Sequence, residues 1–293
     1  MNVLLGLLVG FAAATDSVLV TTDGVAELKG AIIVDARDSE QFAAGHIPGA
    51  TLLDVDSLSE ERAGVINMLK PMSELRPLFL AAGLKADAPL VVYAGLGDAG
   101  DLIRATRLFW ALEYAGFRDV RLLDGGLAKW NAEGRGLEKG PSQVVPTKAS
   151  DLKGLAPREG VYANREDLMA AQAAKKGLIV DLRGERHFSG ASKSDYIARG
   201  GHVPGALNHP ASDLIDGDFT TFRSVEAIRE ILGADDKLTK EPVVTYCNSG
   251  RSATIGYVAY RIAGFEDVAV YDGSMAEWGN REDCPLSSDS NNE

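Results

Sequence analysis

Residues 242–264 read PVVTYCNSGRSATIGYVAYRIAG and contain the pattern from which the fold can be worked out. The β-branched residues at the start predict a buried strand, and apolar residues at helical spacing predict a helix over residues 252–263. Cys247 opens the six-residue loop between them. A thiol at that point lies beside a helix N-terminus, where unpaired N–H groups and the helix dipole favour an anion. The pattern therefore predicts a nucleophilic thiolate at Cys247.

Gly250 lets this loop curl back without a Cβ clash, and we expect several backbone amides to face the Cys247 sulfur as a result. The alternative is that Cys247 is a small buried hydrophobic residue at the end of a strand. The loop alone does not decide between the two, so the rest of the chain has to.

The chain contains an internal repeat, which indicates two homologous domains. Five blocks recur in the same order: 32–37 as 178–183, 45–50 as 201–206, 89–94 as 242–247, 115–120 as 263–268 and 123–130 as 271–278. Ala94 stands at the position of Cys247, so only the second half carries the nucleophile.

Each half alternates apolar strands with amphipathic helices, which predicts an α/β fold with a parallel sheet flanked by helices. In the second half we expect strands near 178–181, 206–208, 243–246 and 268–271, and helices near 165–175, 224–232 and 252–263. The predicted units are an inactive domain (17–134), a linker rich in Gly, Pro, Ser and Lys (135–158), a catalytic domain (159–286) and a disordered polar tail (287–293).

Composition limits the function. The 293 residues carry a formal net charge of −12, which argues against nucleic acid and anionic membranes as partners. Two cysteines and four scattered histidines predict neither a disulfide framework nor a metal site.

The first residues resemble an export signal. Residues 3–14 form an apolar run of 12 residues, too short to span a bilayer, and Ala12 and Ala14 supply small residues for cleavage. We expect residues 1–16 to be a signal peptide and the protein to be exported, for example to the periplasm. Because no Lys or Arg precedes the run, a buried first element of a cytoplasmic protein is the alternative.

Residues 95–100, GLGDAG, match the G-x-G-x-x-G pattern of dinucleotide-binding loops. The repeat explains them more simply as the counterpart of the Cys247 loop. Asp98 and Asp101 would also repel a pyrophosphate at that helix end, so we do not expect a dinucleotide site.

The repeated blocks, together with the Asp-Gly-Gly and Asp-Gly-Ser turns before Trp130 and Trp278, resemble the tandem-domain rhodanese family of thiosulfate and 3-mercaptopyruvate sulfurtransferases over residues 17–286. The resemblance implies an inactive first domain and a second domain whose cysteine carries a persulfide. It also implies a small anionic sulfur donor such as thiosulfate, and a sulfur acceptor that is cyanide, a thiol or a protein. By the same resemblance, no metal or organic cofactor is expected.

The resemblance also suggests the binding residues. The loop residues after Cys247 would form the anion cradle, with Arg251 as the positive charge for thiosulfate: Asn248, Ser249, Gly250, Arg251 and Ser252. Arg186 lies one residue from the position where the family places a substrate-carboxylate arginine, which here holds His187, and Arg199 is a second candidate. Arg183, His46 and His202 recur in both halves or have counterparts there, which favours structural roles for them.

Other functions stay open or are disfavoured. The donor could be 3-mercaptopyruvate, because the neutral Asn248 and Ser249 match neither subfamily. The protein could also be a non-catalytic sulfur-relay or binding module. A cysteine phosphatase is disfavoured, because its phosphate-binding arginine would fall at Ala253. Cys284 is expected to be an incidental thiol.

Overall fold

The computed structural model describes residues 18–95, 99–158, 160–216 and 221–288. The predicted signal peptide and the tip of the G-x-G-x-x-G loop lie outside these ranges, so export stays a prediction. In the ranges described, no helix has the length and apolar character needed to cross a membrane.

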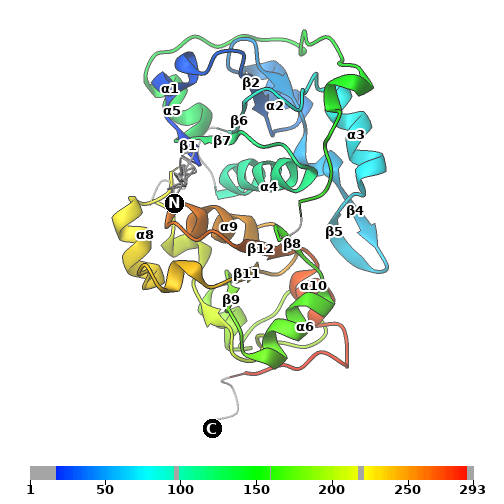
Figure 1. Ribbon diagram of the computed structural model, residues 1–293, viewed down its shortest axis with the longest axis vertical. Coiled ribbons are helices and arrows are strands. Elements are labelled where there is room, and N and C mark those ends of the chain that lie inside the picture. Colours follow the sequence, from blue (N-terminus) through cyan, green and yellow to red (C-terminus); the bar gives the residue numbers. More distant parts are fainter. Residues whose placement is uncertain (1–17, 96–98, 159, 217–220, 289–293) are drawn as a thin grey trace, which may run out of the picture.

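The first half is built on a five-stranded parallel sheet in the order β1-β7-β6-β2-β3 (Figure 1). Its strands are β1 (Leu19–Val20), β2 (Ile32–Asp35), β3 (Thr51–Leu52), β6 (Leu90–Tyr93) and β7 (Val120–Leu123). Its helices are α1 (Thr22–Glu27), α2 (Ser39–Ala44), α3 (Met72–Ala81), α4 (Ala99–Ala115), α5 (Gly126–Ala132) and the short 3-10 helix η1 (Val55–Leu58). A hairpin of β4 (Ser59–Arg62) and β5 (Val65–Leu69) projects beside the second half.

The second half repeats this sheet in the order β10-β9-β11-β12-β8. Its strands are β8 (Tyr162–Ala163), β9 (Leu178–Asp181), β10 (Leu207–Asn208), β11 (Val243–Tyr246) and β12 (Val268–Tyr271). Its helices are α6 (Arg165–Ala174), α7 (Glu185–Phe188), α8 (Val225–Leu232), α9 (Ala253–Ile262) and α10 (Ser274–Trp278), with 3-10 helices η3 (Ala211–Asp213) and η4 (Leu238–Lys240). A further 3-10 helix, η2 (Ala149–Leu152), lies in the linker.

The two sheets have the same strand order, with β6 at the position of β11. Strands β6 and β12 are buried at every residue, as expected for parallel strands covered by helices on both faces. The predicted α/β fold with two homologous domains is therefore confirmed. The edge strand β8 was not predicted, because two residues carry no readable alternation.

The repeated Asp-x-Arg block forms the same buried ion pair in each half. Arg37 binds Asp35, and Arg183 binds Asp181, with a shortest distance of 2.6 Å in both. Each arginine also donates to the carbonyl of the glycine that starts the Gly-His turn. Since the half without a nucleophile has the same pair, Arg183 is structural.

The Gly-His turns of the two halves are held by their histidines. The Nδ1 atoms of His46 and His202 lie 2.9 Å and 2.8 Å from the carbonyl oxygens of Phe42 and Phe188, and each imidazole stacks on the ring of that phenylalanine. His202 also exchanges two backbone hydrogen bonds with Ser287. Ser287, the first residue of the predicted tail, thus pairs with the second domain.

The halves meet through α4 and α9, which lie side by side between the two sheets (Figure 1). Thr106 and Thr254, which are equivalent in the repeat, join by a hydrogen bond of 2.9 Å between their hydroxyls. Seven residues after Thr106 in α4, buried Glu113 accepts hydrogen bonds from Tyr257 and Arg261. The loop before α9 therefore faces the first half.

Candidate active site

Cys247 lies at the carboxyl end of β11, in the centre of the second sheet, and is only 2% exposed. Open α/β sheets bind their ligands at this edge. The loop of residues 247–252 leads from there into α9, as the sequence predicted.

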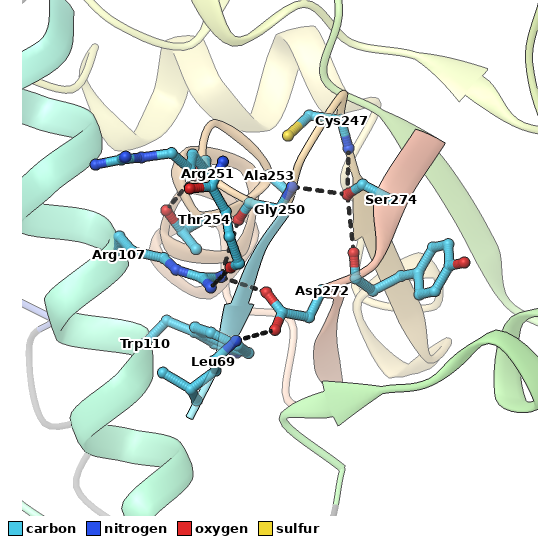
Figure 2. Close-up of polar contacts among 12 residues, drawn as sticks. Leu69, Arg107, Trp110, Cys247, Gly250, Arg251, Ala253, Thr254, Asp272 and Ser274 are labelled. Carbon is cyan, nitrogen blue, oxygen red and sulfur yellow. Dashed lines mark hydrogen bonds and ion pairs between the residues drawn. The ribbon is translucent and has the colours of Figure 1, made fainter. Parts of the chain in front are cut away.

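Ser274, the first residue of α10, fastens the loop (Figure 2). Its hydroxyl accepts the N–H groups of Cys247 (3.1 Å) and Gly250 (3.0 Å) and donates to the carbonyl of Tyr271 (2.9 Å). Two amides of α10 also donate back to loop carbonyls, Met275 to Cys247 and Ala276 to Asn248. The loop is therefore held from both its N–H and its C=O groups.

Gly250 is required by the loop, although its amide does not play the expected part. Its φ is +73°, and a Cβ there would lie 2.4 Å from the carbonyl oxygen of Asp272. The N–H, however, donates to Ser274. We had expected it to face the Cys247 sulfur, so this amide is reassigned from anion binding to loop geometry.

A pocket of about 390 Å³ opens at Cys247, and both halves of the chain line it. Its lining residues are Cys247, Asn248, Ser249, Arg251 and Ser252 of the loop, Tyr196 of the same half, and Asp56, Gly100, Ile103 and Arg104 of the first half. Four of the five predicted loop residues thus meet at one pocket with the thiol.

Two guanidinium groups line the pocket, and each lies beside a carboxylate. Arg251 forms an ion pair with Asp56 at 2.6 Å, and Arg104 lies 3.4 Å from its helix neighbour Asp101. All four side chains keep some solvent exposure. An anion entering the pocket would therefore meet two arginines, each next to a carboxylate.

The sequence alone did not indicate that residues of the first half line the pocket. Asp56 and Arg104 carry no local signal of a site, and their role depends on how the domains dock. The position of Arg104 on the helix that follows the G-x-G-x-x-G loop was the one available hint.

The other two predicted arginines lie elsewhere in the described structure. Arg186 is exposed on α7 and does not line the pocket. The Arg199 guanidinium donates to the carbonyls of Trp278, Arg281 and Cys284, and so ties down the C-terminal segment. Substrate binding by Arg186 and Arg199 stays a prediction to which this pocket lends no support.

Cys284 is also a free thiol, but it belongs to a different environment. It is buried in the core formed with Tyr271 and Trp278, and burial raises the pKa of its thiol. The pocket lining does not include it. This placement agrees with an incidental thiol.

The first half keeps a backbone contact of the site but has Ala94 in place of the cysteine. The carbonyl of Ala94 accepts the N–H of Leu127, as that of Cys247 accepts the N–H of Met275.

Within the described ranges, no group of three or more His, Cys, Asp or Glu side chains could hold a metal ion.

A buried cysteine in an amide-rich loop, at the end of a central parallel strand and beside an arginine-lined pocket, defines a cysteine-dependent group-transfer enzyme of the α/β class. The Rhodanese-like domain model matches the chain twice, at residues 22–133 and 164–281. The chain therefore belongs to the rhodanese family, as a member with two domains.

Two of the similar proteins are bacterial sulfurtransferases that differ in donor. The 3-mercaptopyruvate sulfurtransferase of Escherichia coli is 30% identical over 254 residues, which cover 86% of each chain. The thiosulfate sulfurtransferase of Azotobacter vinelandii is 30% identical over 258 residues, covering 87% of this chain and 90% of the relative. Among solved structures, an anaerobic ergothioneine biosynthesis enzyme from Chlorobium limicola shares the fold, with a TM-score of 0.83 and 23% identity over 93% of this chain and 70% of that one.

Proposed function

We propose that this protein is a sulfurtransferase that takes the outer sulfur of thiosulfate and carries it as a persulfide on Cys247. The observation that carries the proposal is the shared pocket, in which the Cys247 thiol lies with Arg251 and Arg104. Both named relatives are sulfurtransferases, although they differ in donor.

The chemistry balances without an oxidant. The Cys247 thiolate attacks the outer sulfur of thiosulfate, an S–S bond to the enzyme forms, and the S–S bond of thiosulfate breaks with its electron pair leaving on sulfite. A nucleophilic acceptor, such as cyanide or a thiol, then attacks the outer persulfide sulfur. The enzyme S–S bond breaks and the thiolate returns.

The loop supports both steps. Backbone N–H groups at the N-terminus of α9 can donate hydrogen bonds to the anionic oxygens of the donor. The Arg251 guanidinium can bind sulfonate oxygens of the donor through charge-assisted hydrogen bonds. Ser274 holds the Cys247 backbone while the sulfur changes its bonding partner.

The choice of donor follows from the charges. Thiosulfate is a compact dianion, which suits two guanidinium groups in one pocket. The arginine offered by the sequence for the carboxylate of 3-mercaptopyruvate, Arg186, does not line the pocket. We therefore propose thiosulfate as the donor and keep 3-mercaptopyruvate as the alternative.

The test is kcat/KM for both donors with cyanide as acceptor, in the wild type, Cys247→Ser and Arg251→Ala. We expect a preference for thiosulfate, no turnover in Cys247→Ser, and a loss of about tenfold or more in Arg251→Ala, the size of one charge-assisted contact. A preference for 3-mercaptopyruvate that depends on Arg186 would contradict the donor assignment. Silence with both donors would contradict small-molecule turnover and favour a sulfur-relay module.

A further inference from the structure

Arg107 is a buried arginine of the first half that reaches the catalytic loop of the second (Figure 2). From α4, its Nη1 donates to the carbonyl of Gly250 (3.1 Å) and to Oδ1 of Asp272 (2.6 Å), and its Nη2 donates to the carbonyl of Asn67 (2.7 Å). We propose that Arg107 is a positioning residue: the half that lacks a nucleophile sets the geometry of the loop that carries one. This proposal rests on the proposed role of Cys247.

The contact is restrained because Asp272 and Gly250 are buried and each makes a second hydrogen bond. Asp272 is fully buried, and its Oδ2 accepts the N–H of Leu69 at 2.7 Å, so the β4–β5 hairpin closes on the same carboxylate. The Arg107 guanidinium also lies 4.5 Å from the ring centroid of Trp110. A buried ion pair held by several hydrogen bonds tolerates little movement, although the buried Nε of Arg107 itself has no hydrogen-bond partner among the described residues.

The repeat shows that this arrangement is particular to the catalytic half. Asp124, the counterpart of Asp272, pairs instead with Lys129 of its own half, and both side chains are partly exposed. By the same alignment, the counterpart of Arg107 in α9 is Ile255, an apolar core residue. The first half thus carries a charged residue, Arg107, at the position where the second half has the apolar core residue Ile255.

Arg107 acts on the loop through one peptide unit. Gly250 is held at its N–H by Ser274 and at its carbonyl by Arg107. Since a trans peptide is planar, fixing this carbonyl also fixes the N–H of Arg251, which points the opposite way. Arg107 therefore sets the direction of the Arg251 N–H, which points away from Arg107. Arg251 is one of the residues that line the pocket.

The test compares the wild type with Arg107→Lys, which keeps a positive charge against Asp272 but loses the planar fork that reaches three acceptors. Two quantities are measured: the rate of Cys247 alkylation by iodoacetamide at neutral pH, mapped by mass spectrometry, and the split between kcat and KM for thiosulfate. We expect alkylation and kcat to fall about tenfold and KM to change less than about twofold, because Arg107 does not touch the pocket. Unchanged alkylation and kcat in the folded variant would overturn the proposal.

Glu113→Gln is the matched control. Glu113 lies on the same helix, is buried, and crosses the same interface to Tyr257 (2.6 Å) and Arg261 (2.8 Å), away from the loop. Its variant should lower thermal stability while Cys247 alkylation stays within about twofold of the wild type. An equal loss of alkylation in Glu113→Gln would overturn the proposal, since any loosening of the interface would then have the same effect.

A second variant covers failure of the first to fold. Asp272→Asn removes the charge that holds Arg107 and is expected to slow alkylation in the same direction. Normal alkylation in folded Asp272→Asn would overturn the proposal. Unfolding of both Arg107→Lys and Asp272→Asn would also overturn it, because the ion pair would then serve global stability. Alkylation needs no sulfur donor, so a wild type without sulfur transfer would refute the proposed function and leave this test intact.

Discussion

Nη2 of Arg251 lies 2.6 Å from Oδ1 of Asp56, and this ion pair joins the catalytic loop to the 3-10 helix η1 of the first half at the pocket. The arginine best placed to bind a donor anion is thus already neutralised by a carboxylate of the other domain. A donor anion has to share or displace Asp56. Since the Asp56 side chain is 58% exposed and that of Arg251 31% exposed, the pair is weak enough to open.

Removing this competitor should improve donor binding. In Asp56→Asn, we expect the KM for thiosulfate to fall about two- to fivefold, the range that corresponds to an exposed ion pair. The gain should shrink as the ionic strength is raised, because salt screens the pair in the wild type. Steady-state kinetics at low and high salt measure both effects.

The control for Asp56→Asn is Glu266→Gln, which breaks the exposed pair of Glu266 with Lys240, away from the pocket. It should leave the KM unchanged. A higher KM in Asp56→Asn would show that Asp56 orients Arg251 for binding rather than competing with the donor.

Ser274 combines backbone strain with loop fastening. Its φ is +48°, in a region that costs a residue with a side chain about 1 kcal/mol, and its counterpart in the first half is Gly126 with φ +53°. We expect Ser274→Gly to be about 1 kcal/mol more stable than Ser274→Ala, as measured by urea unfolding. Both variants should lose kcat, because the N–H groups of Cys247 and Gly250 lose their shared acceptor. A Ser274→Gly enzyme with wild-type kcat would show that the hydroxyl is dispensable.

His209 makes stability depend on pH. Its Nδ1 lies 2.9 Å from the Tyr260 hydroxyl, and burial lowers the pKa of its imidazole below the ordinary 6.5. In the unfolded chain His209 has the ordinary pKa and therefore binds more protons at mildly acidic pH than it does in the folded protein. The contribution of His209 to the stability of the fold is thus complete above about pH 6.5 and is lost as the pH falls below that value.

Urea unfolding at several pH values checks this dependence. The free energy of unfolding of the wild type should fall more steeply below about pH 6.5 than that of His209→Phe, which keeps an aromatic ring but cannot be protonated. Parallel curves would show that His209 keeps its ordinary pKa in the folded protein.

The sequence predicted what is local and repeated. The Asp-x-Arg pairs, the Gly-His turns and the strand, loop and helix around Cys247 each lie within a short segment, so periodicity and the second copy were enough to interpret them. Helix α9 was predicted at residues 252–263 and begins at Ala253. Such one-residue differences are normal for helix ends.

What the sequence could not predict depends on docking of the two halves. Asp56, Arg104 and Arg107 stand far from Cys247 in the chain. They line the pocket or contact the loop only because η1 and α4 of the first half lie against the second half. Likewise, Arg186 and Arg199 were suggested by their position in the sequence, and the direction of their side chains could not be inferred from it.

The most direct test of the account is the mass of the intact protein after incubation with thiosulfate in the absence of an acceptor. We predict that the wild type gains one sulfur atom, mapped to Cys247, with release of one equivalent of sulfite, and that cyanide removes this sulfur again. Cys247→Ser should gain nothing. A wild-type protein without added sulfur, or with the sulfur mapped to Cys284, would contradict a persulfide on Cys247.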